Sequence, residues 1–440
     1  IYKEYYNYDI DSAYHYARRM LALAQSYGDG TRINCARVYL AKTVLNGGMY
    51  GDRPLHYLDN AATTFKPRQV IEASDRYYTD ICANTKRGDY ALAHDADVAY
   101  DESRETVARF INADPEEVVF TSGDTMGLNF VAYGLMPGLK KGDEIVLSWE
   151  EHASNALPWF RVAQITGASI KYVPLTEDGR ITPENLKSVV NENTKVVALA
   201  SISNVLGRPL PVRELARIAH SVGAVYVDDG AQSVPHSETD VRETDVDFLC
   251  FSGHKMLGPT GMGVLYGKEE CLEGLRALQY GGGTVGLVTY DSVDFAPVPD
   301  RFEAGLQNYA GIFGTKAAVE YLEKVGMENI ARNDADLMRY MFSRIEDVKG
   351  LSVVGPEDPD KRCAVLSFNI DGLGSHDVAM MLDSVDGIMV RSGMHCAHPF
   401  FVSRKVEGSV RASVYLYNNR SDIDRFATAL GKIAETFGGR

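Results

Sequence analysis

A chain of 440 residues is long enough for two domains, because single hydrophobic cores stop growing near about 250–300 residues. Its 45% hydrophobic and 24% charged residues are typical of a soluble globular protein, and no apolar run approaches the roughly 18 residues that a membrane span needs. The formal net charge of −15 argues against nucleic-acid binding and against binding to anionic lipid, since both need basic surfaces.

The six cysteines are scattered, without a Cys-x-x-Cys pair or a Cys/His cluster at zinc spacing. We therefore expect no metal site and reduced thiols in a cytoplasmic protein. The first residues also lack the basic-then-apolar order of a signal peptide. The cysteines are Cys35, Cys82, Cys250, Cys271, Cys363 and Cys396.

Residues 1–54 are predicted to form a helical N-terminal extension. Apolar residues recur at helical spacing over 13–24, Gly28-Asp29-Gly30 ends that stretch, and 32–45 is predicted as a second helix. The simplest interpretation is a packing element on the main domain. A second hypothesis is that the extension alters the choice of partner or covers the mouth of the active site.

Residues 55–310 are predicted to form a large domain built on an open, mostly parallel sheet. Short runs rich in Val, Ile, Ala and Leu alternate with helix-length segments such as 212–222, and this order predicts helices on both faces of the sheet. Ligands of such sheets bind at the carboxyl ends of the strands. The predicted strands are 117–121, 144–148, 169–174, 196–202, 224–228 and 247–252.

Residues 311–440 are predicted to form a smaller α/β domain. Helices at 314–325 and 327–348 lead into it, and a helix at 422–437 closes the chain. Its predicted strands are 351–354, 364–369, 388–390 and 410–415.

Two residues at predicted strand ends suggest chemistry on a pyridine ring. Lys255 follows the strand 247–252, where a lysine is costly to bury unless its amine has a task or a counter-charge. A partly desolvated lysine has a lowered pKa, as Schiff-base formation requires. Asp229 ends the preceding strand, where a carboxylate could hold the protonated nitrogen of a pyridine ring. Each residue alone is more often a surface lysine or a capping acid.

Two further signals follow other strands. Small and hydroxyl residues at 121–125 open a helix and suit a phosphate at a helix N-terminus, although this segment is not a Walker loop. His152 follows the strand 144–148, where an imidazole could stack on a flat ring and, as a catalytic residue, pass protons. Together the four signals supply a phosphate site, a ring-stacking group, a pyridine partner and a Schiff-base lysine. The sequence therefore indicates a pyridoxal-phosphate (PLP) enzyme.

From about residue 57 to the C-terminus the chain resembles the cysteine desulfurases, in the class V branch of fold-type I PLP enzymes. The absence of a long insertion between Cys396 and Arg411 is similar to the SUF-type group. The resemblance implies the fold-type I arrangement, a large PLP-binding domain and a smaller C-terminal domain. It is carried by Asp-Gly-Ala-Gln at 229–232, Ser-Gly-His-Lys-Met-Leu-Gly-Pro-Thr-Gly at 252–261, Arg-Phe-Glu-Ala-Gly at 301–305 and Arg-Ser-Gly-Met-His-Cys-Ala at 391–397.

The resemblance implies roles around the ring of the cofactor. Lys255 would hold the cofactor, and Asp229 would pair with the pyridine nitrogen. Gln232 would meet the phenolate oxygen and His152 would stack on the ring. Asn204 would lie beside both cofactor and substrate.

The resemblance also implies a phosphate site made of Thr125, Ser252 and His254, with backbone amides near Asp124. Because a carboxylate would repel phosphate, we expect the side chain of Asp124 to point away and only its amide to contribute.

Cys396 is implied to be the sulfur acceptor, in a loop beside two arginines that favour its thiolate. Arg411 would take the carboxylate of L-cysteine, with Arg391 close by. Lys255 would remove the α-proton, and attack by Cys396 on the substrate sulfur would leave an enzyme persulfide and release L-alanine. The implied partners are a second copy of the chain in a homodimer and a sulfur-acceptor protein, with iron–sulfur clusters or other thio-cofactors as the destination.

Four residues depart from the pattern of the family. Leu306 stands where a threonine usually reaches the phosphate of the partner subunit, and Lys86 stands where a histidine is usual near the substrate. Ala153 replaces a second histidine, and Asp124 replaces a threonine. These departures bear on substrate preference and cofactor affinity.

Two alternatives stay open at this point. One is selenocysteine lyase, or another class V PLP lyase, which needs no acceptor thiol. The other is a non-catalytic sulfur carrier or scaffold that retains the fold, although such a protein would have no need of Lys255, Asp229 and His152 together.

Overall fold

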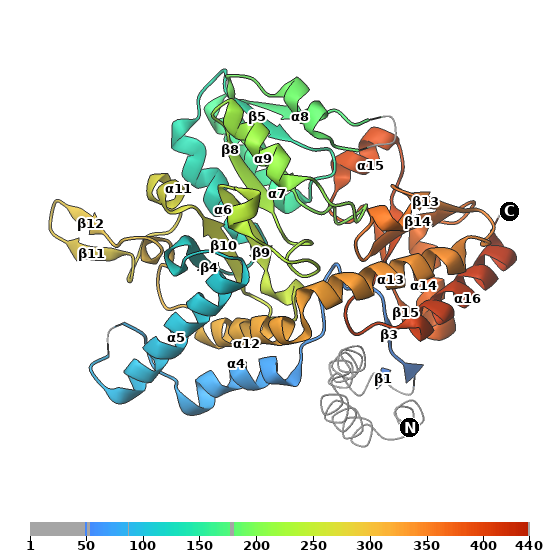
Figure 1. Ribbon diagram of the computed structural model, residues 1–440, viewed down its shortest axis with the longest axis horizontal. Helices are drawn as coiled ribbons and strands as arrows, with labels where there is room; N and C mark the ends of the chain where they lie inside the picture. Colours follow the sequence, from blue (N-terminus) through green and yellow to red (C-terminus); the bar gives the residue numbers. More distant parts are fainter. Residues whose placement is uncertain (1–48, 51–52, 87, 177–179, 439–440) are drawn as a thin grey trace.

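The computed structural model describes residues 49–50, 53–86, 88–176 and 180–438 (Figure 1). The predicted helical extension therefore lies almost entirely outside the described residues. Its last part forms a two-stranded antiparallel pair, β1 (Met49–Tyr50) and β2 (Arg53–Pro54).

A seven-stranded sheet lies at the centre of the large domain, in the order β4-β10-β9-β8-β7-β5-β6. The strands β6, β5, β7, β8 and β9 run parallel, which confirms the predicted mostly parallel sheet. The prediction omitted β10, which pairs antiparallel with both β4 and β9. The strand bounds are β4 (Val118–Thr121), β5 (Glu144–Leu147), β6 (Ser169–Tyr172), β7 (Thr194–Ala200), β8 (Val225–Asp229), β9 (Phe248–Ser252) and β10 (Gly263–Gly267).

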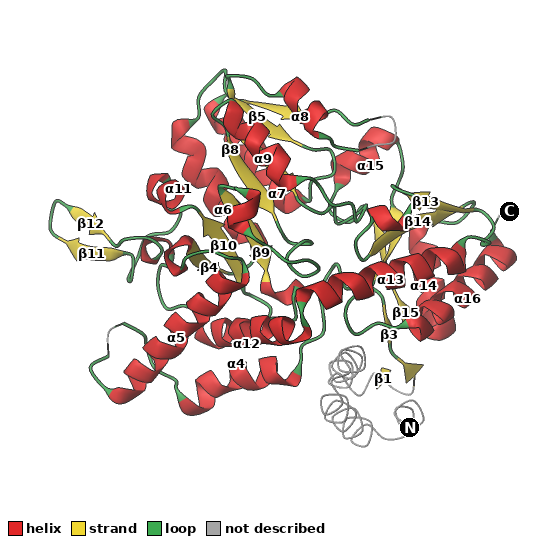
Figure 2. Cartoon of the chain, in the orientation of Figure 1, coloured by secondary structure: helices red, strands yellow, loops and turns green. Residues whose placement is uncertain are grey.

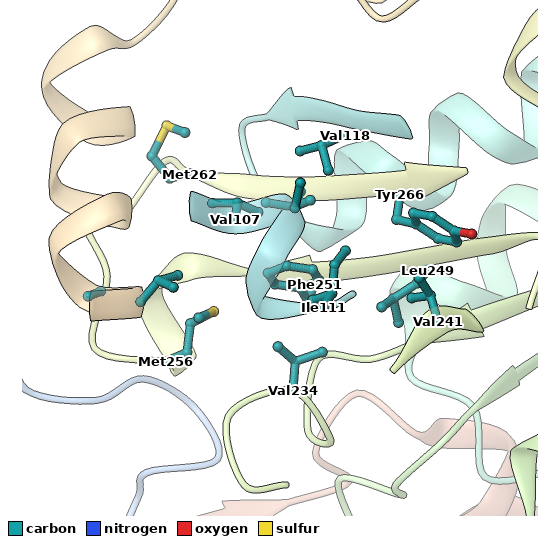
Figure 3. Packing of buried hydrophobic residues seen from close by; sticks show 14 of the residues in the cluster. Val107, Ile111, Val118, Val234, Val241, Leu249, Phe251, Met256, Met262 and Tyr266 are labelled. Carbon is teal, nitrogen blue, oxygen red and sulfur yellow. The ribbon is translucent and has the colours of Figure 1, made fainter. Parts of the chain in front are cut away.

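Alternate side chains of these strands enter two separate hydrophobic cores, one on each face of the sheet. In β9, Leu249 and Phe251 pack into one core, whereas Phe248 and Cys250 pack into the other. Figure 3 shows the first core, where Leu249 and Phe251 lie among side chains from neighbouring strands and helices. Burial on both faces explains why these strands are continuous apolar runs in the sequence.

Helices cover both faces of the sheet (Figure 2). The helix α9 illustrates why they form, because Leu215, Ala216 and Ala219 make one buried stripe, and Gly223 with φ 74° follows its end. The helices of this part are α4 (Arg68–Asp80), α5 (Ala91–Phe110), α6 (Asp124–Leu135), α7 (Ala153–Thr166), α8 (Pro183–Val189), α9 (Val212–Ser221), α10 (Val241–Thr244), α11 (Glu269–Gly274) and α12 (Tyr309–Val325).

The smaller part of the chain is a four-stranded antiparallel sheet, in the order β13-β14-β17-β16, with helices packed on it. The predicted strand 388–390 is present but pairs in parallel with β3 instead, and β16 was not predicted. The elements are β3 (His56–Tyr57), β13 (Leu351–Val354), β14 (Val365–Ile370), β15 (Ile388–Met389), β16 (Arg391–Gly393), β17 (Ser409–Ser413), α13 (Met327–Ile345), α14 (Ser375–Asp386), α15 (His398–Arg404) and α16 (Arg420–Phe437).

The chain passes from one part to the other between α12 and α13. Apolar residues of α12, such as Ile312 and Val319, belong to the core of the large sheet, whereas Leu337 and Met341 of α13 belong to that of the small sheet. Gly326 joins the two helices with φ 89°, a conformation that glycine adopts without strain. The division at 310/311 remains a prediction.

A hairpin of β11 (Val285–Val288) and β12 (Val293–Phe295) extends away from the body of the molecule (Figure 1). It exposes apolar side chains that a globular surface seldom presents together. These are Leu287, Val288, Tyr290, Val293 and Phe295.

No helix among the described residues is both long enough and apolar enough to cross a membrane. The five cysteines in the described part of the chain are free thiols.

A buried ion pair fastens the segment 301–305 to the core. Both guanidinium ends of Arg104 contact the Glu303 carboxylate, with Nη1–Oε1 and Nη2–Oε2 distances of 3.0 and 2.8 Å. Oε1 also accepts a 2.7 Å hydrogen bond from the amide of Phe120, and Oε2 accepts one from the hydroxyl of Tyr100. Because the side chains are only 7% and 3% exposed, neither charge has water as an alternative partner.

We expect Glu303→Gln to lower the free energy of unfolding by about 3 kcal/mol, because it leaves the Arg104 charge buried without its counter-ion. Urea denaturation with an unchanged slope would measure the loss. The matched control is Glu328→Gln, which breaks an exposed pair with Arg332 and is expected to cost less than about 1 kcal/mol. Equal losses in the two variants would contradict a structural role for the buried pair.

Candidate active site

Four of the predicted site residues stand at the carboxyl ends of strands in the large sheet. Asp229 ends β8, and Lys255 lies in the short 3-10 turn (Gly253–Lys255) that follows β9. Asp124 begins α6 after β4, and His152 caps α7 after β5. These strand ends meet at one edge of the sheet, and the residues lie close enough to shift one another's pKa.

Lys255 lies among several charged groups that shift the pKa of its amine. Burial lowers the pKa of its amine, and the positive charges of Arg411 and Arg391 lower it further, whereas Asp124 and Asp229 oppose the shift. The side chain is half-buried, and its Nζ makes no hydrogen bond or ion pair with any residue that the structure describes. A partly buried amine with a lowered pKa and no fixed partner is suited to act as a nucleophile or a base.

Asp229 is buried beside this amine. Its Oδ1 accepts a hydrogen bond of 3.0 Å from the amide of Ala231. Burial raises the pKa of its carboxyl, and Lys255 opposes the rise. Three residues on, Gln232 Nε2 donates to the carbonyl of Ala61 at 2.9 Å, which connects the end of β8 to the segment 57–63.

The turn before α6 packs closely against the backbone of neighbouring strands. The amide of Asp124 donates to Ser252 Oγ at 2.8 Å. Gly123 has φ 153°, and a Cβ on Gly263 would lie only 2.4 Å from its Cα, so β10 approaches the turn as closely as glycine permits. The carboxyl of Asp124 is buried near Asp229 and Lys255, and its amide faces Ser252.

A chain of hydrogen bonds joins the start of α6 to that of α7. Thr125 Oγ1 lies 2.7 Å from Ser154 Oγ, which lies 3.0 Å from His152 Nδ1. Burial lowers the pKa of His152 to about 4, and Lys255 adds to the shift, so the imidazole is neutral at neutral pH. Ser154 was not singled out in the sequence, where it is one more serine near a helix start.

His254 is held by a neighbour that the sequence analysis missed. Its carbonyl accepts hydrogen bonds from Lys66 Nζ at 2.9 Å and from Thr64 Oγ1 at 3.1 Å. Burial lowers the pKa of His254 to about 4 and that of Lys66 to about 8. No sequence signal marked Lys66, because it lies 188 residues from its partner.

Cys396 stands in a strained loop between β16 and α15. His395 and Cys396 have φ 49° and 60°, a left-handed conformation that costs non-glycine residues about 1–3 kcal/mol each. Two bonds stabilise it: Asn204 Nδ2 donates to the carbonyl of His395 at 2.8 Å, and the amide of Ala153 donates to that of Cys396 at 2.7 Å. Arg391 Nη2 lies 4.0 Å from the Cys396 sulfur.

Arg411 of β17 lies directly opposite Arg391 of β16 in the antiparallel strand pair. It is 1% exposed, its Nη1 donates to the carbonyl of Asn204 at 3.0 Å, and its Nη2 lies 3.1 Å from Asp59 Oδ1. Its Nε is buried without a hydrogen-bond partner among the described residues. The guanidinium therefore keeps a donor for a further acceptor such as a carboxylate.

Two residues that depart from the family pattern lie together elsewhere. Lys86 forms an ion pair with Asp300, and the side chain of Leu306 is 68% exposed. Both line a cavity of about 250 Å³ whose walls include none of the strand-end residues described above.

Comparison with known proteins agrees with this geometry. The family model described as aminotransferase class-V matches residues 56–426. A probable cysteine desulfurase of Halalkalibacterium halodurans is 46% identical over 88% of this chain and 94% of its own. A cysteine desulfurase of Haloferax volcanii is 40% identical over 87% of this chain and 90% of its own.

Solved structures give the same result. The apo cysteine desulfurase of Thermococcus onnurineus superposes with a TM-score of 0.83 at 39% identity, covering 86% of this chain and 94% of its own. The cysteine desulfurase CsdA of Escherichia coli, solved as its S-sulfonic acid form, gives 0.80 at 35% identity, covering 87% and 95%. These structures confirm the predicted fold-type I architecture.

A second family model, described as SusR N-terminal TPR domain, matches residues 1–101. The aminotransferase class-V match, over residues 56–426, overlaps it at residues 56–101 and includes every strand-end residue of the site. The chain belongs to the aminotransferase class-V family and, within it, to the cysteine desulfurases.

Proposed function

We propose that this chain is a PLP-dependent cysteine desulfurase that takes sulfur from L-cysteine onto Cys396 and releases L-alanine. The observation that carries the proposal is the amine of Lys255, half-buried at the edge of the sheet without a hydrogen bond or ion pair to the described residues, flanked by Asp229 and near the loop that presents Cys396.

The residues present fit PLP. Ser252 Oγ, the amide of Asp124 and the close-packed turn at Gly123 suit a phosphate. Asp229 suits the protonated ring nitrogen, and the neutral imidazole of His152 suits stacking on the ring. Family membership implies the same cofactor.

When bound, PLP supplies an electron sink that makes the α-proton of an amino acid acidic. Lys255 would hold it and, once released, would take that proton, because its lowered pKa leaves the amine able to accept one. Gln232, Thr125, His254 and Asn204 complete the proposed cofactor site.

Arg411 would bind the carboxylate of L-cysteine. The Nε of Arg411 has no hydrogen-bond partner among the described residues, and its Nη2 contacts Asp59, so both groups could donate to the carboxylate of the substrate. Arg391 adds positive charge on the same side. Burial raises the pKa of the Asp59 carboxyl and Arg411 opposes the rise, so Asp59 would take up a proton more readily once Arg411 turns to the substrate.

Cys396 would attack the substrate sulfur as a thiolate. A bond forms between its sulfur and that of the substrate, the Cβ–S bond of the substrate breaks, and its electron pair passes to Cβ, which a proton converts to the methyl group of alanine. The enzyme keeps a persulfide, so atoms and electrons balance without an added oxidant. The Cys396 sulfur lies 4.0 Å from Arg391 Nη2.

We also propose a homodimer and a separate protein that accepts the sulfur, in the manner of the SUF-type group, for iron–sulfur clusters or other thio-cofactors. Support for the homodimer comes from the exposed apolar hairpin of β11 and β12 and from the exposed Leu306, which a second copy could cover. The N-terminal extension at 1–54 is proposed to influence acceptor choice.

The test is to mix the purified, PLP-loaded protein with L-cysteine and a thiol reductant. We expect a yellow protein that forms alanine and sulfide in equal amounts. L-serine is the matched control, since it has the same amine and carboxylate but no sulfur, and it should give no alanine. A protein that stays colourless with added PLP, or that is yellow but forms no alanine from L-cysteine, would contradict the proposal.

A further inference from the structure

Asp124 is a buried acid to which the proposed mechanism gives no task for its carboxyl group. Its side chain begins α6 and is 5% exposed. Oδ1 is inaccessible to solvent and has no hydrogen-bond partner among the described residues, whereas the backbone amide is satisfied by Ser252. A buried acceptor without a donor is costly, so its presence calls for a reason other than packing.

The charged and titratable groups around this carboxyl come from two neighbouring strand ends. Lys255 follows β9, Cys250 lies within β9, and Asp228 and Asp229 end β8. Lys255 is the positively charged member of this set, so it is the group that Asp124 can stabilise.

The two acids beside Lys255 are not equivalent. Asp229 Oδ1 already accepts from Ala231, and in the proposed function its carboxylate is committed to the ring nitrogen. Asp124 has no such commitment, and of the two it opposes the lowering of the Lys255 pKa more strongly. Arg411 and Arg391 act on the amine in the opposite direction.

We infer that Asp124 is a positioning residue that retains a proton on the Lys255 nitrogen of the cofactor-loaded enzyme. This inference rests on the proposed function. The inference assigns a role to the carboxyl of Asp124, the residue that replaces the threonine usual in the family. The phosphate would be bound by the backbone amide at this position, so the carboxyl is left for another role.

The direction of the effect follows from the surrounding charges. With Asp124 replaced by a neutral residue, burial, Arg411 and Arg391 would favour loss of the proton from the Lys255 nitrogen, and only Asp229 among the acids that act on it would still oppose the loss. The proton would then leave at lower pH. Burial also raises the pKa of Asp124, and the charge of Lys255 opposes that rise, so the two groups titrate as a pair.

The experiment is a pH titration of the absorption of the PLP-loaded protein. Lysine-bound PLP absorbs visible light when its nitrogen is protonated and near-ultraviolet light when it is not. We expect Asp124→Asn to lower the midpoint between the two bands by about 1 pH unit or more. The matched control is Asp228→Asn, which removes a buried acid hydrogen-bonded to the amide of Ser201 and should leave the midpoint unchanged.

The outcomes separate this inference from the proposed function. A wild-type protein that takes up no PLP would contradict the proposed function itself. A yellow wild type with the same midpoint in Asp124→Asn, or an equal shift in Asp228→Asn, would overturn the inference and leave the function standing. If the asparagine variant does not fold, Asp124→Ser, which is smaller and also neutral, repeats the test. Folded variants that no longer bind PLP would also overturn the inference, because Asp124 is inferred to affect only the proton on the Lys255 nitrogen.

Discussion

Replacing Lys255 by alanine will abolish covalent retention of PLP and lower the rate of alanine formation by about 10²- to 10⁴-fold or more. The residue is assigned two tasks, holding the cofactor and moving the α-proton, and no other lysine ends a strand beside Asp229 in the described part of the chain. The fold should survive, because removing a partly buried amine relieves a desolvation cost.

The measurement is the visible absorption after gel filtration, together with alanine formed from L-cysteine. Lys268→Ala is the matched control, because it removes a lysine that is paired with Asp245 and Asp247 away from the carboxyl end of β9. We expect the control to stay yellow and active. A Lys255→Ala protein that keeps its colour on gel filtration and its activity would contradict the assignment.

Replacing Cys396 by alanine will separate cofactor chemistry from sulfur transfer. The variant should remain yellow, because Cys396 contacts the rest of the site through backbone bonds that alanine can also make. Alanine formation from L-cysteine should fall by about 100-fold or more, since no thiolate remains to take the sulfur. Initial rates with L-cysteine and with L-selenocysteine measure the two activities side by side.

Cys82→Ser is the matched control, because Cys82 is an exposed thiol far along the chain from the site. It should retain the wild-type rate. If Cys396→Ala formed alanine from L-cysteine at the wild-type rate and turned over L-selenocysteine faster, the sulfur-acceptor role would be excluded and a selenocysteine lyase would be favoured.

The strand-end residues could be predicted from sequence because a parallel sheet decides their position. Asp229 and Lys255 follow buried apolar runs, and the carboxyl ends of such runs meet at one edge whatever the details of packing. The runs themselves were recognisable because both faces of each strand are buried. Local pattern was therefore enough for these residues.

The strand β10 was missed for a local reason. It is short, begins and ends with Gly263 and Gly267, and so carries a weak strand pattern. Its first glycine is explained only by the structure, where the turn at Gly123 leaves no room for a Cβ.

The backbone conformation of the loop that carries Cys396 could not be predicted from the sequence. The loop is held by Asn204, 191 residues away, and by the amide of Ala153. No periodicity or turn signal encodes such long-range bonds, and the left-handed conformation of Cys396 is uncommon for a residue other than glycine. The unpaired carboxyl oxygen of Asp124 is likewise visible only once the neighbouring strand ends are in place.

The most direct measurement of the central claim is the location of the sulfur after one turnover. PLP-loaded protein is mixed with L-cysteine without reductant, digested, and examined by mass spectrometry for a peptide heavier by one sulfur atom. We expect that mass on the peptide that contains Cys396, and its loss on treatment with a reductant. Alanine formation without added sulfur on this peptide, or with the sulfur on another cysteine such as Cys82, would contradict the account.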